Sequence, residues 1–421
     1  MNLVTMVERG IALLFALCFS YQAFYLLWMI IKRKRVTESD SPFHKMAIVI
    51  SARNEEGVIG SLLESINNQN YPNEYYKVFV VADNCTDQTA MVARSRGAAV
   101  FERKDSRLKG KGYALDYLFQ KLLPKDDGVE AYLVIDADNI LDRNYLREIN
   151  KTFDAGYRIV TGYRNSKNYG SNWISAGHAL WFIRESKYLN HARMILNTSC
   201  TVSGTGFLVK RDILKKNGGW KYHLLTEDIE FSVDQILKGE TIGYCPDAVL
   251  YDEQPVLWSQ SWNQRSRWSK GFYQVLGKYG FKLFEAAVQK PSFACFDMLM
   301  VLFPAIFLTL LSVLCYTIKI GYILAAGCPG VLITNMMQGI LYAVVNGYAC
   351  MFLIGAITTC SEWKKICCTP LRKIMYAFTF PLFMFTYAPL AIIALFKKVE
   401  WKPIHHTVIK NYEQIQELSR Q

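Results

Sequence analysis

Long apolar segments on both sides of a polar central block constrain this chain more than any other feature. Residues 11–31 form 21 positions without a charge, and a helix of that length crosses about 30 Å of hydrocarbon. Further apolar segments lie at about 297–318, 331–358 and 374–396. The four segments predict a membrane protein with an α-helical membrane part and a polar domain between its first helix and about three C-terminal helices.

The positive charges predict an orientation. The basic run 32–35 follows the first apolar segment directly, without the small-residue cleavage site of a signal peptide. Basic residues tend to stay in the cytoplasm, so residues 32 to about 295 are expected inside and the N-terminus outside. Four crossings would then place the C-terminus outside, together with the last basic residues, which are Lys397, Lys398 and Lys402. Pro381 and Pro389 interrupt the last segment, and a kinked or re-entrant segment there is the alternative.

The formal net charge of +12 is better explained by a bilayer than by nucleic acid. Many of the positive charges lie next to apolar segments, at 32–35, 364–365, 372–373 and 397–398. Anionic lipid headgroups attract charges placed in this way. The eleven cysteines show no paired CxxC spacing and the six histidines are unclustered, so no disulfide framework and no histidine-based metal site are predicted.

Strand-like and helix-like patterns alternate between residues 46 and 250. Short apolar runs predict strands, and helical stretches lie at 57–67 and 89–96; the predicted strands are 46–51, 78–82, 131–135 and 157–161. This alternation predicts an α/β domain with a Rossmann-like, mostly parallel mixed sheet covered by helices. Ligands of such sheets bind beyond the carboxyl ends of the strands.

Polar and mainly acidic residues follow three of these strands. Asn54 and Glu55 follow the first strand and Asp83 follows the second. Asp136 and Asp138 form an Asp-x-Asp motif after the third, a pattern that alone also occurs in ordinary turns. Paired carboxylates can hold Mg²⁺ or Mn²⁺ against a diphosphate, and we expect Asp138 to be the main ligand, with Asp136 contacting the nucleotide or the metal shell.

Two further motifs suit transfer from a diphosphate. Lys111 belongs to a Lys-Gly-Lys-Gly run without Walker spacing, which is either a flexible turn or a backbone that approaches a diphosphate closely. Thr226, Glu227 and Asp228 precede a helical stretch, where Thr226 can cap the helix. A rigid helix start can also present a general base to a hydroxyl. Asp228 is the first candidate for this base, and Glu227 is the second.

The sequence Gln264-x-x-Arg267-Trp268 lies in an aromatic and basic stretch at 256–296 that suits helices lying along a membrane interface. The composition alone would favour an interfacial cluster. However, Gln264 and Arg267 are one turn apart on one helix face, and arginine grips a diphosphate with a forked geometry. Trp268 can stack on a sugar ring. We count Arg265 with these three as residues expected to bind the acceptor and the diphosphate, which we call the acceptor and diphosphate group.

These motifs, in this order, resemble the membrane-integrated family 2 glycosyltransferases, which include cellulose, chitin, hyaluronan and poly-N-acetylglucosamine synthases. The resemblance covers about 45–270 by motif and implies a GT-A-type glycosyltransferase domain embedded between transmembrane helices, with a UDP-sugar donor and inversion to a β-linkage. It implies nucleotide contacts from Ala52, Asn54, Glu55, Asp83, Lys111 and Asp136. It also implies that Ser203, Gly204, Thr205 and Gly206 form a turn beside the acceptor, and that Gln264, Arg267 and Trp268 mark processive members.

The resemblance implies an enzyme of the plasma membrane that polymerises UDP-glucose or UDP-N-acetylglucosamine into an exopolysaccharide on the cytoplasmic side. The expected domains are a first helix with its basic flank (1–35), the catalytic domain (36–255), interface helices (256–296), C-terminal transmembrane helices (297–400) and a tail (401–421). The gating loop and regulatory domain of regulated cellulose synthases are not found in the sequence. A single addition to a lipid carrier or glycolipid is the alternative function, and a non-catalytic membrane scaffold or transporter is a third. A homo-oligomer is compatible with each of them.

Overall fold

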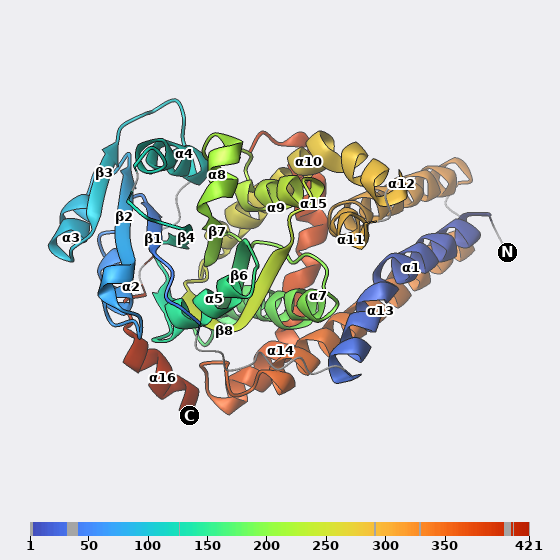
Figure 1. Ribbon diagram of the computed structural model, residues 1–421. Helices are drawn as coiled ribbons and strands as arrows, with labels where there is room; N and C mark the ends of the chain where they lie inside the picture. Colours follow the sequence, from blue (N-terminus) through green and yellow to red (C-terminus); the bar gives the residue numbers. More distant parts are fainter. Residues whose placement is uncertain are drawn as a thin grey trace.

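The computed structural model describes residues 3–31, 41–125, 127–289, 292–327, 330–399, 406 and 408–420. It shows a mixed sheet packed between helices, with apolar helices projecting away from it (Figure 1). The basic run 32–35 and Lys402 lie outside the described residues.

The sheet has eight strands in the order β3-β2-β1-β4-β7-β6-β8-β5. Neighbouring pairs among β3, β2, β1 and β4 are parallel, whereas β7 is antiparallel to both of its neighbours. The strands are β1 (Met46–Ala52), β2 (Tyr76–Asp83), β3 (Ala99–Arg103), β4 (Ala131–Asp136), β5 (Ile140–Leu141), β6 (Ile159–Ser166), β7 (Phe207–Lys210) and β8 (Ile242–Asp252). The predicted α/β mixed sheet is confirmed, and the four predicted strands correspond to β1, β2, β4 and β6.

Helices cover both faces of this sheet (Figure 1). They are α2 (Ile59–Asn67), η1 (Asn73–Tyr75), α3 (Thr89–Ser95), α4 (Lys111–Leu122), α5 (Tyr145–Asp154), α6 (Trp173–Arg184), η2 (Glu185–Asn190), α7 (His191–Ile195), α8 (Arg211–Asn217) and α9 (Glu227–Leu237). Alternate residues of a strand point to opposite faces, so Ala47 and Val49 of β1 join the core beneath α4, whereas Ile48 and Ile50 join the core beneath α2. The near-continuous apolar run of β1 is therefore explained by burial on both faces.

The register of the sheet brings the predicted polar strand ends to one edge. Ala52 of β1 pairs with Ala82 of β2, and Ser51 pairs with Asp136 of β4. The carboxyl ends of three neighbouring parallel strands therefore lie side by side, which is where ligands of such sheets bind.

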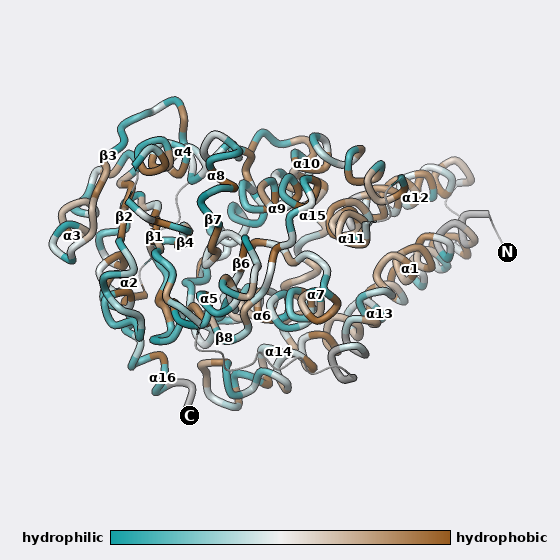
Figure 2. Tube along the Cα trace, in the orientation of Figure 1, coloured by the Kyte–Doolittle hydropathy of each residue, from teal (hydrophilic) through white to brown (hydrophobic). Residues whose placement is uncertain are grey.

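Helices account for the rest of the chain, and most of them are apolar, with many brown residues in Figure 2. They are α1 (Leu3–Ile31), α11 (Phe293–Leu302), α12 (Pro304–Ala325), α13 (Gly330–Ser361), α14 (Pro370–Phe385) and α15 (Tyr387–Phe396); α10 (Trp258–Gln289) precedes them and α16 (Tyr412–Arg420) follows them. Within the described residues, three stretches are long and apolar enough to cross a membrane: Phe293–Ala325, Gly330–Ser361 and Pro370–Phe396.

The C-terminal tail returns to the sheet domain. The Tyr412 hydroxyl donates to the Asp142 carboxylate at 2.8 Å, Glu413 forms an ion pair with Arg143 at 2.6 Å, and Ile415 is fully buried. Because α16 packs on the sheet domain, the two must lie on the same side of any membrane. Four plain crossings would place the C-terminus on the opposite side, whereas this packing requires an even number of crossings between residue 270 and α16.

The last apolar segment explains why the number of crossings is even. Near its start, Arg372 donates to the carbonyl oxygen of Gly170 at 2.9 Å. At its end, the carbonyl oxygen of Leu395 accepts from Lys270 of α10 at 3.3 Å. One end therefore contacts the sheet domain and the other contacts α10, and the helix breaks at Thr386, between α14 and α15. The arrangement favours the re-entrant alternative over a plain crossing.

Candidate active site

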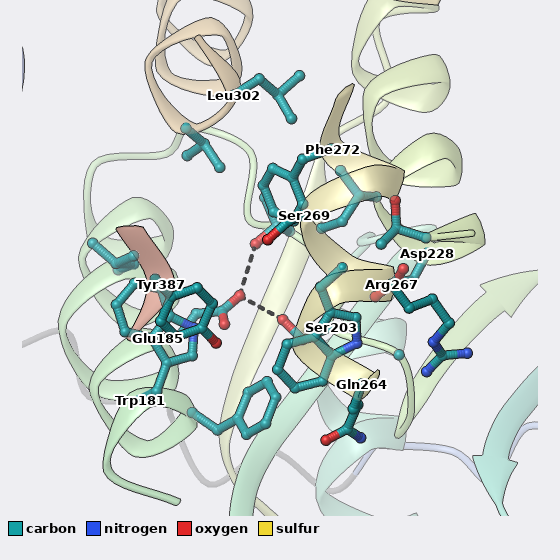
Figure 3. Close-up of a pocket in the computed structure, with 18 of the residues that line it drawn as sticks. Trp181, Glu185, Ser203, Asp228, Gln264, Arg267, Ser269, Phe272, Leu302 and Tyr387 are labelled. Carbon is teal, nitrogen blue, oxygen red and sulfur yellow. Dashed lines mark hydrogen bonds between the residues drawn. The ribbon is translucent and has the colours of Figure 1, made fainter. Parts of the chain in front are cut away.

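A cavity of about 520 Å³ joins the carboxyl edge of the sheet to the apolar helices. Its polar end carries the predicted acids and bases, and its other end is built from α1, α11, α12 and α15, with Leu302 and Tyr387 seen in Figure 3. The predicted site residues that line it are Lys111, Asp136, Gly204, Glu227, Asp228, Gln264, Arg267 and Trp268. Elements more than 150 residues apart in the chain therefore share one cavity, as the sequence motifs predicted.

Lys111 ties two of the predicted motifs together. Its ammonium group donates to the Asp136 carboxylate and to the Gly204 carbonyl oxygen, both at 2.5 Å. Lys111 is the first residue of α4, and Gly110 before it has φ = 123°, a conformation that favours glycine. A positive side chain at the start of α4 and the adjacent helix N-terminus both suit an anionic diphosphate.

The Gly204–Gly206 turn holds the end of β4. The Thr205 hydroxyl accepts from the backbone N–H of Asp136 at 2.9 Å and donates to the Asn139 side chain at 2.5 Å. Gly206 has φ = 66°, and a Cβ there would lie 1.9 Å from a methyl carbon of Leu250. Glycine at this position is therefore a packing requirement, and the turn sets the position of Asp136.

Asp138 lies behind Asp136 and is only 8% exposed. One of its oxygens accepts from the backbone N–H of Glu253 at 3.1 Å and lies 3.8 Å from Nε2 of His406. Nδ1 of His406 contacts the Glu55 carboxylate at 3.0 Å. Although burial opposes a charge on this imidazole, Asp138 and then Glu55 raise the pKa of His406 to about 9.

The donor set suits a hard divalent cation. Mg²⁺ is commonly held by one or two carboxylates together with substrate phosphates and water, without a full cage of protein ligands. Asp136 lines the cavity and supplies one such carboxylate, whereas Asp138, the expected main ligand, is buried and is not among the residues that line it. Within the described part of the chain, no group of three or more His, Cys, Asp and Glu side chains is placed to hold a metal ion.

The acid pair at the start of α9 faces the cavity. Burial, followed by the neighbouring charge of Asp228, raises the pKa of Glu227 to about 7. Burial also raises the pKa of Asp228, while Lys111 and Arg267 oppose that rise. A carboxylate with a raised pKa is a stronger proton acceptor than an exposed one, so the pair is suited to general base catalysis.

Replacing Glu227 with Gln is expected to shift the acid limb of the pH–rate profile to lower pH. A general base works when deprotonated, so kcat/KM falls as the pH drops through the pKa of the base. The repulsion between Glu227 and Asp228 is mutual, so removing one charge lowers the pKa of the other. Profiles of UDP release by the wild type and the variant would measure the shift. An unmoved limb would contradict a base coupled to Glu227.

Helix α10 presents three of its predicted residues to the cavity. Gln264, Arg267 and Trp268 all line it, as their spacing on one helix face predicted. The Trp268 ring packs edge-on against His178 and Phe182 of α6, with centroids 5.6 Å away in each case. This packing fixes the plane of the indole without covering its cavity side.

Arg265 is placed elsewhere, which corrects its inclusion in the acceptor and diphosphate group. Its guanidinium is fully buried, bonds the Thr386 hydroxyl, and lies 4.4 Å from the Phe383 ring centroid. Arg265 follows Gln264 by one residue, which is about 100° around a helix, so it points away from the cavity. It holds α10 to the break between α14 and α15.

The predicted nucleotide residues lie at the sheet edge next to the cavity. Asn54 has φ = 56°, and its side-chain oxygen accepts from the backbone N–H of Thr86 at 2.8 Å. The Asp83 carboxylate is buried and accepts from Arg103 at 2.6 Å. Ala52 ends β1 beside them. These residues shape a loop pair at the carboxyl edge, and their contacts with a nucleotide stay a prediction.

Several cavity residues were not predicted. Arg164 stands near the end of β6 and forms a 2.5 Å ion pair with Asp252, a strand-end position that the sequence pattern could have suggested. Glu185 and Tyr387 lie in helical sequence with no motif around them. His406 of the tail does not line the cavity, but it contacts Glu55 and Asp138, two of the predicted residues.

Comparisons with known proteins agree with this geometry. A family model described as "Glycosyltransferase like family 2" matches residues 44–271, which is more than half of the chain. A β-monoglucosyldiacylglycerol synthase from Synechocystis sp. is 26% identical over 242 residues, covering 56% of this chain and 49% of that protein. A poly-β-1,6-N-acetyl-D-glucosamine synthase from Staphylococcus epidermidis is 26% identical over 240 residues, covering 55% of each chain. The chain thus spans about half the length of these relatives.

A similar fold occurs in a solved structure. The mannosyltransferase PcManGT from Pyrobaculum calidifontis, in complex with GDP-Man and Mn²⁺, has a TM-score of 0.58 at 16% identity. The match covers 91% of this chain and 98% of that chain, so it includes apolar helices as well as the sheet domain.

Proposed function

The chain belongs to the glycosyltransferase-like family 2, and on that premise we propose that it transfers a sugar from a UDP-sugar to a hydroxyl of a lipid-linked acceptor at a membrane face. UDP-glucose and UDP-N-acetylglucosamine are the proposed donors. The proposed layout keeps the catalytic domain on the cytoplasmic side, with α10 along the interface.

The observation that carries this proposal is the two-ended character of the cavity. Asp136, Asp228 and Arg267 line one end. Aliphatic side chains from the membrane-candidate helices line the other; they include Val301, Leu302, Ala388 and Ala391. An apolar wall favours hydrocarbon over a hydrated glycan, so an acceptor with a polar head and an acyl or prenyl tail matches both ends.

The proposed reaction is a single displacement. Asp228 takes the proton of the acceptor hydroxyl as its oxygen bonds the anomeric carbon, and the bond from that carbon to the diphosphate oxygen breaks with its electron pair on UDP. Attack from the face opposite the leaving group inverts the configuration. Lys111 and Arg267 offset the charge that develops on the diphosphate. A divalent cation held by Asp136 and Asp138 would neutralise more of that charge.

A processive polymerase, the function that the sequence motifs favoured, is the second candidate. The indole rings of Trp181 and Trp268 line the same cavity, and aromatic faces suit pyranose rings. The poly-N-acetylglucosamine synthase among the relatives agrees with this alternative, as the glycolipid synthase agrees with the first.

Product size separates the two candidates. The chain in lipid nanodiscs, given radiolabelled UDP-glucose or UDP-N-acetylglucosamine with Mg²⁺ or Mn²⁺, is expected to convert the label into one species that partitions into chloroform–methanol. A ladder or a high polymer left in the aqueous phase would support the processive candidate instead. No UDP release with any donor across a panel of lipid acceptors would exclude both.

A further inference from the structure

Glu185 places a further carboxylate in the cavity, apart from Asp136 and the acid pair of α9. It is the first residue of η2, a π-helical turn that continues directly from α6. Figure 3 shows its side chain beside Tyr387, directed toward Ser203, on the wall opposite Asp228 and Arg267. Single π-helical turns widen a helix locally and are frequent at functional sites.

The two oxygens of this carboxylate have different surroundings. Oε1 accepts from the Ser203 hydroxyl and from the Thr201 hydroxyl, the latter at 3.4 Å (Figure 3). Among the described residues, none donates a hydrogen bond to Oε2 and none forms an ion pair with Glu185. The adjacent Arg184 instead donates to the Gln22 side chain at 2.8 Å and lies 5.1 Å from the Trp181 ring centroid. The carboxylate is therefore fixed by one oxygen and open at the other.

This open oxygen lies close to the proposed site of reaction. Ser203 directly precedes Gly204, and a Cβ built on Gly204 would lie 3.8 Å from Oδ2 of Asp228. One turn of backbone therefore links the Glu185 carboxylate to the acid pair. A group held by Glu185 and a hydroxyl held by Asp228 can belong to one small headgroup.

We propose that Glu185 is an acceptor-binding residue whose Oε2 accepts a hydrogen bond from a second hydroxyl of the acceptor. The acceptor is then a polyol headgroup, such as a lipid-linked sugar, and not diacylglycerol with its single hydroxyl. This inference rests on the proposed function and narrows its substrate class. A site built to bond a hydroxyl rejects analogues without it, because the buried polar group is left unpaired.

The charges of the same wall disfavour a cationic partner for Glu185. Arg164, Arg184 and Arg193 all line this part of the cavity. Arg164 and Arg193 are paired with Asp252 and Asp297, respectively, whereas no carboxylate lies within ion-pair distance of Arg184 in the described chain. The positive charge of an ammonium headgroup would be repelled by these guanidinium groups, whereas a neutral hydroxyl would not be repelled.

Binding and transfer both test the proposal. The probes are octyl β-D-glucopyranoside, which has four free hydroxyls, and 1,2-dioctanoylglycerol, which has one hydroxyl. Binding to the full chain in nanodiscs with UDP is followed by tryptophan fluorescence, since Trp181 and Trp268 line the cavity. Glu185→Gln and Glu185→Ala are compared with the wild type and with Glu74→Gln, an exposed control on η1.

We expect both Glu185 variants to weaken octyl glucoside binding and raise its KM by about tenfold or more, as for loss of a charged hydrogen bond. Hydrolysis of the UDP-sugar without acceptor and the affinity for UDP should stay at the wild-type level, and Glu74→Gln should match the wild type. A role confined to folding would instead change all of these values together.

Three results would overturn the assignment of Glu185: equal glucoside binding by the wild type and Glu185→Ala, no glucoside binding by the wild type, or transfer to dioctanoylglycerol as efficient as to the glucoside. Binding is measured with UDP alone and needs no turnover. A chain that binds the glucoside through Glu185 but releases no UDP would therefore refute the proposed transfer and leave the polyol site standing.

Discussion

Replacing Asp228 with Asn is expected to abolish incorporation of labelled sugar, with a loss of about a thousandfold or more, while UDP binding stays measurable. The amide has nearly the shape of the carboxylate but cannot take the acceptor proton. Asp228 lines the cavity that also holds Lys111, Arg267 and Trp268. In the proposed reaction, its charge is needed to remove the acceptor proton and not to bind UDP. Initial rates of transfer and calorimetric titration with UDP would separate the loss of chemistry from a loss of binding.

The matched control for this variant is Asp247→Asn. Asp247 lies exposed on β8, outside the cavity lining, so the same chemical change there should leave the rate near that of the wild type. Transfer by Asp228→Asn near the original rate would refute Asp228 as the base and turn attention to Glu227. A loss shared by both variants would point to general destabilisation instead.

Replacing Asp297 with Ala is expected to destabilise the chain by about 3–5 kcal/mol, the range for one partner removed from a buried ion pair. The Asp297 carboxylate accepts from the Arg193 guanidinium at 2.6 Å and from the Tyr21 hydroxyl at 2.8 Å. Both members of the ion pair are 1% exposed. The change leaves a guanidinium without its counter-charge where α1, α7 and α11 meet, and thermal unfolding in nanodiscs would measure the cost.

A double variant separates the charge from the packing. Arg193→Met with Asp297→Leu removes both charges and keeps apolar volume, and replacing a buried pair in this way is often neutral. We therefore expect the double variant to unfold closer to the wild type than Asp297→Ala does. If Asp297→Ala alone unfolds at the wild-type temperature, the pair does not hold the membrane-candidate helices to the sheet domain.

Local patterns were sufficient for strands β1, β2, β4 and β6 and for the predicted residues that line the cavity. The apolar runs of β1, β2 and β4 are buried on both faces. Short, near-continuous apolar runs of this kind are typical of strands in a parallel sheet covered by helices. Asp136 follows one of these runs, so its place at the carboxyl edge follows from parallel pairing alone. Gln264, Arg267 and Trp268 share a helix face by periodicity, and the same periodicity should have removed Arg265 from the group.

Positions set by distant packing were not accessible in this way. Glu185 has no motif around it, because its place in the cavity depends on contacts made by folding, such as the one with Ser203. The sequence left open the side of the C-terminus, because a count of apolar segments does not tell a plain crossing from a re-entrant segment. Whether a segment crosses depends on what its ends contact, and one end of 370–396 contacts the sheet domain while the other contacts α10.

The sequence by itself determined the chemistry: carboxylates, a lysine and an arginine–tryptophan pair in motif spacing, on a mixed α/β sheet next to apolar helices. These features depend on residue type and short-range periodicity, which are written in consecutive residues. Only the tertiary structure decided that the tail returns to the sheet domain, that Arg265 faces away from the cavity and that Glu185 faces into it. Those outcomes follow from packing between segments far apart in the chain, where burial and charge pairing select one arrangement among many with the same local pattern.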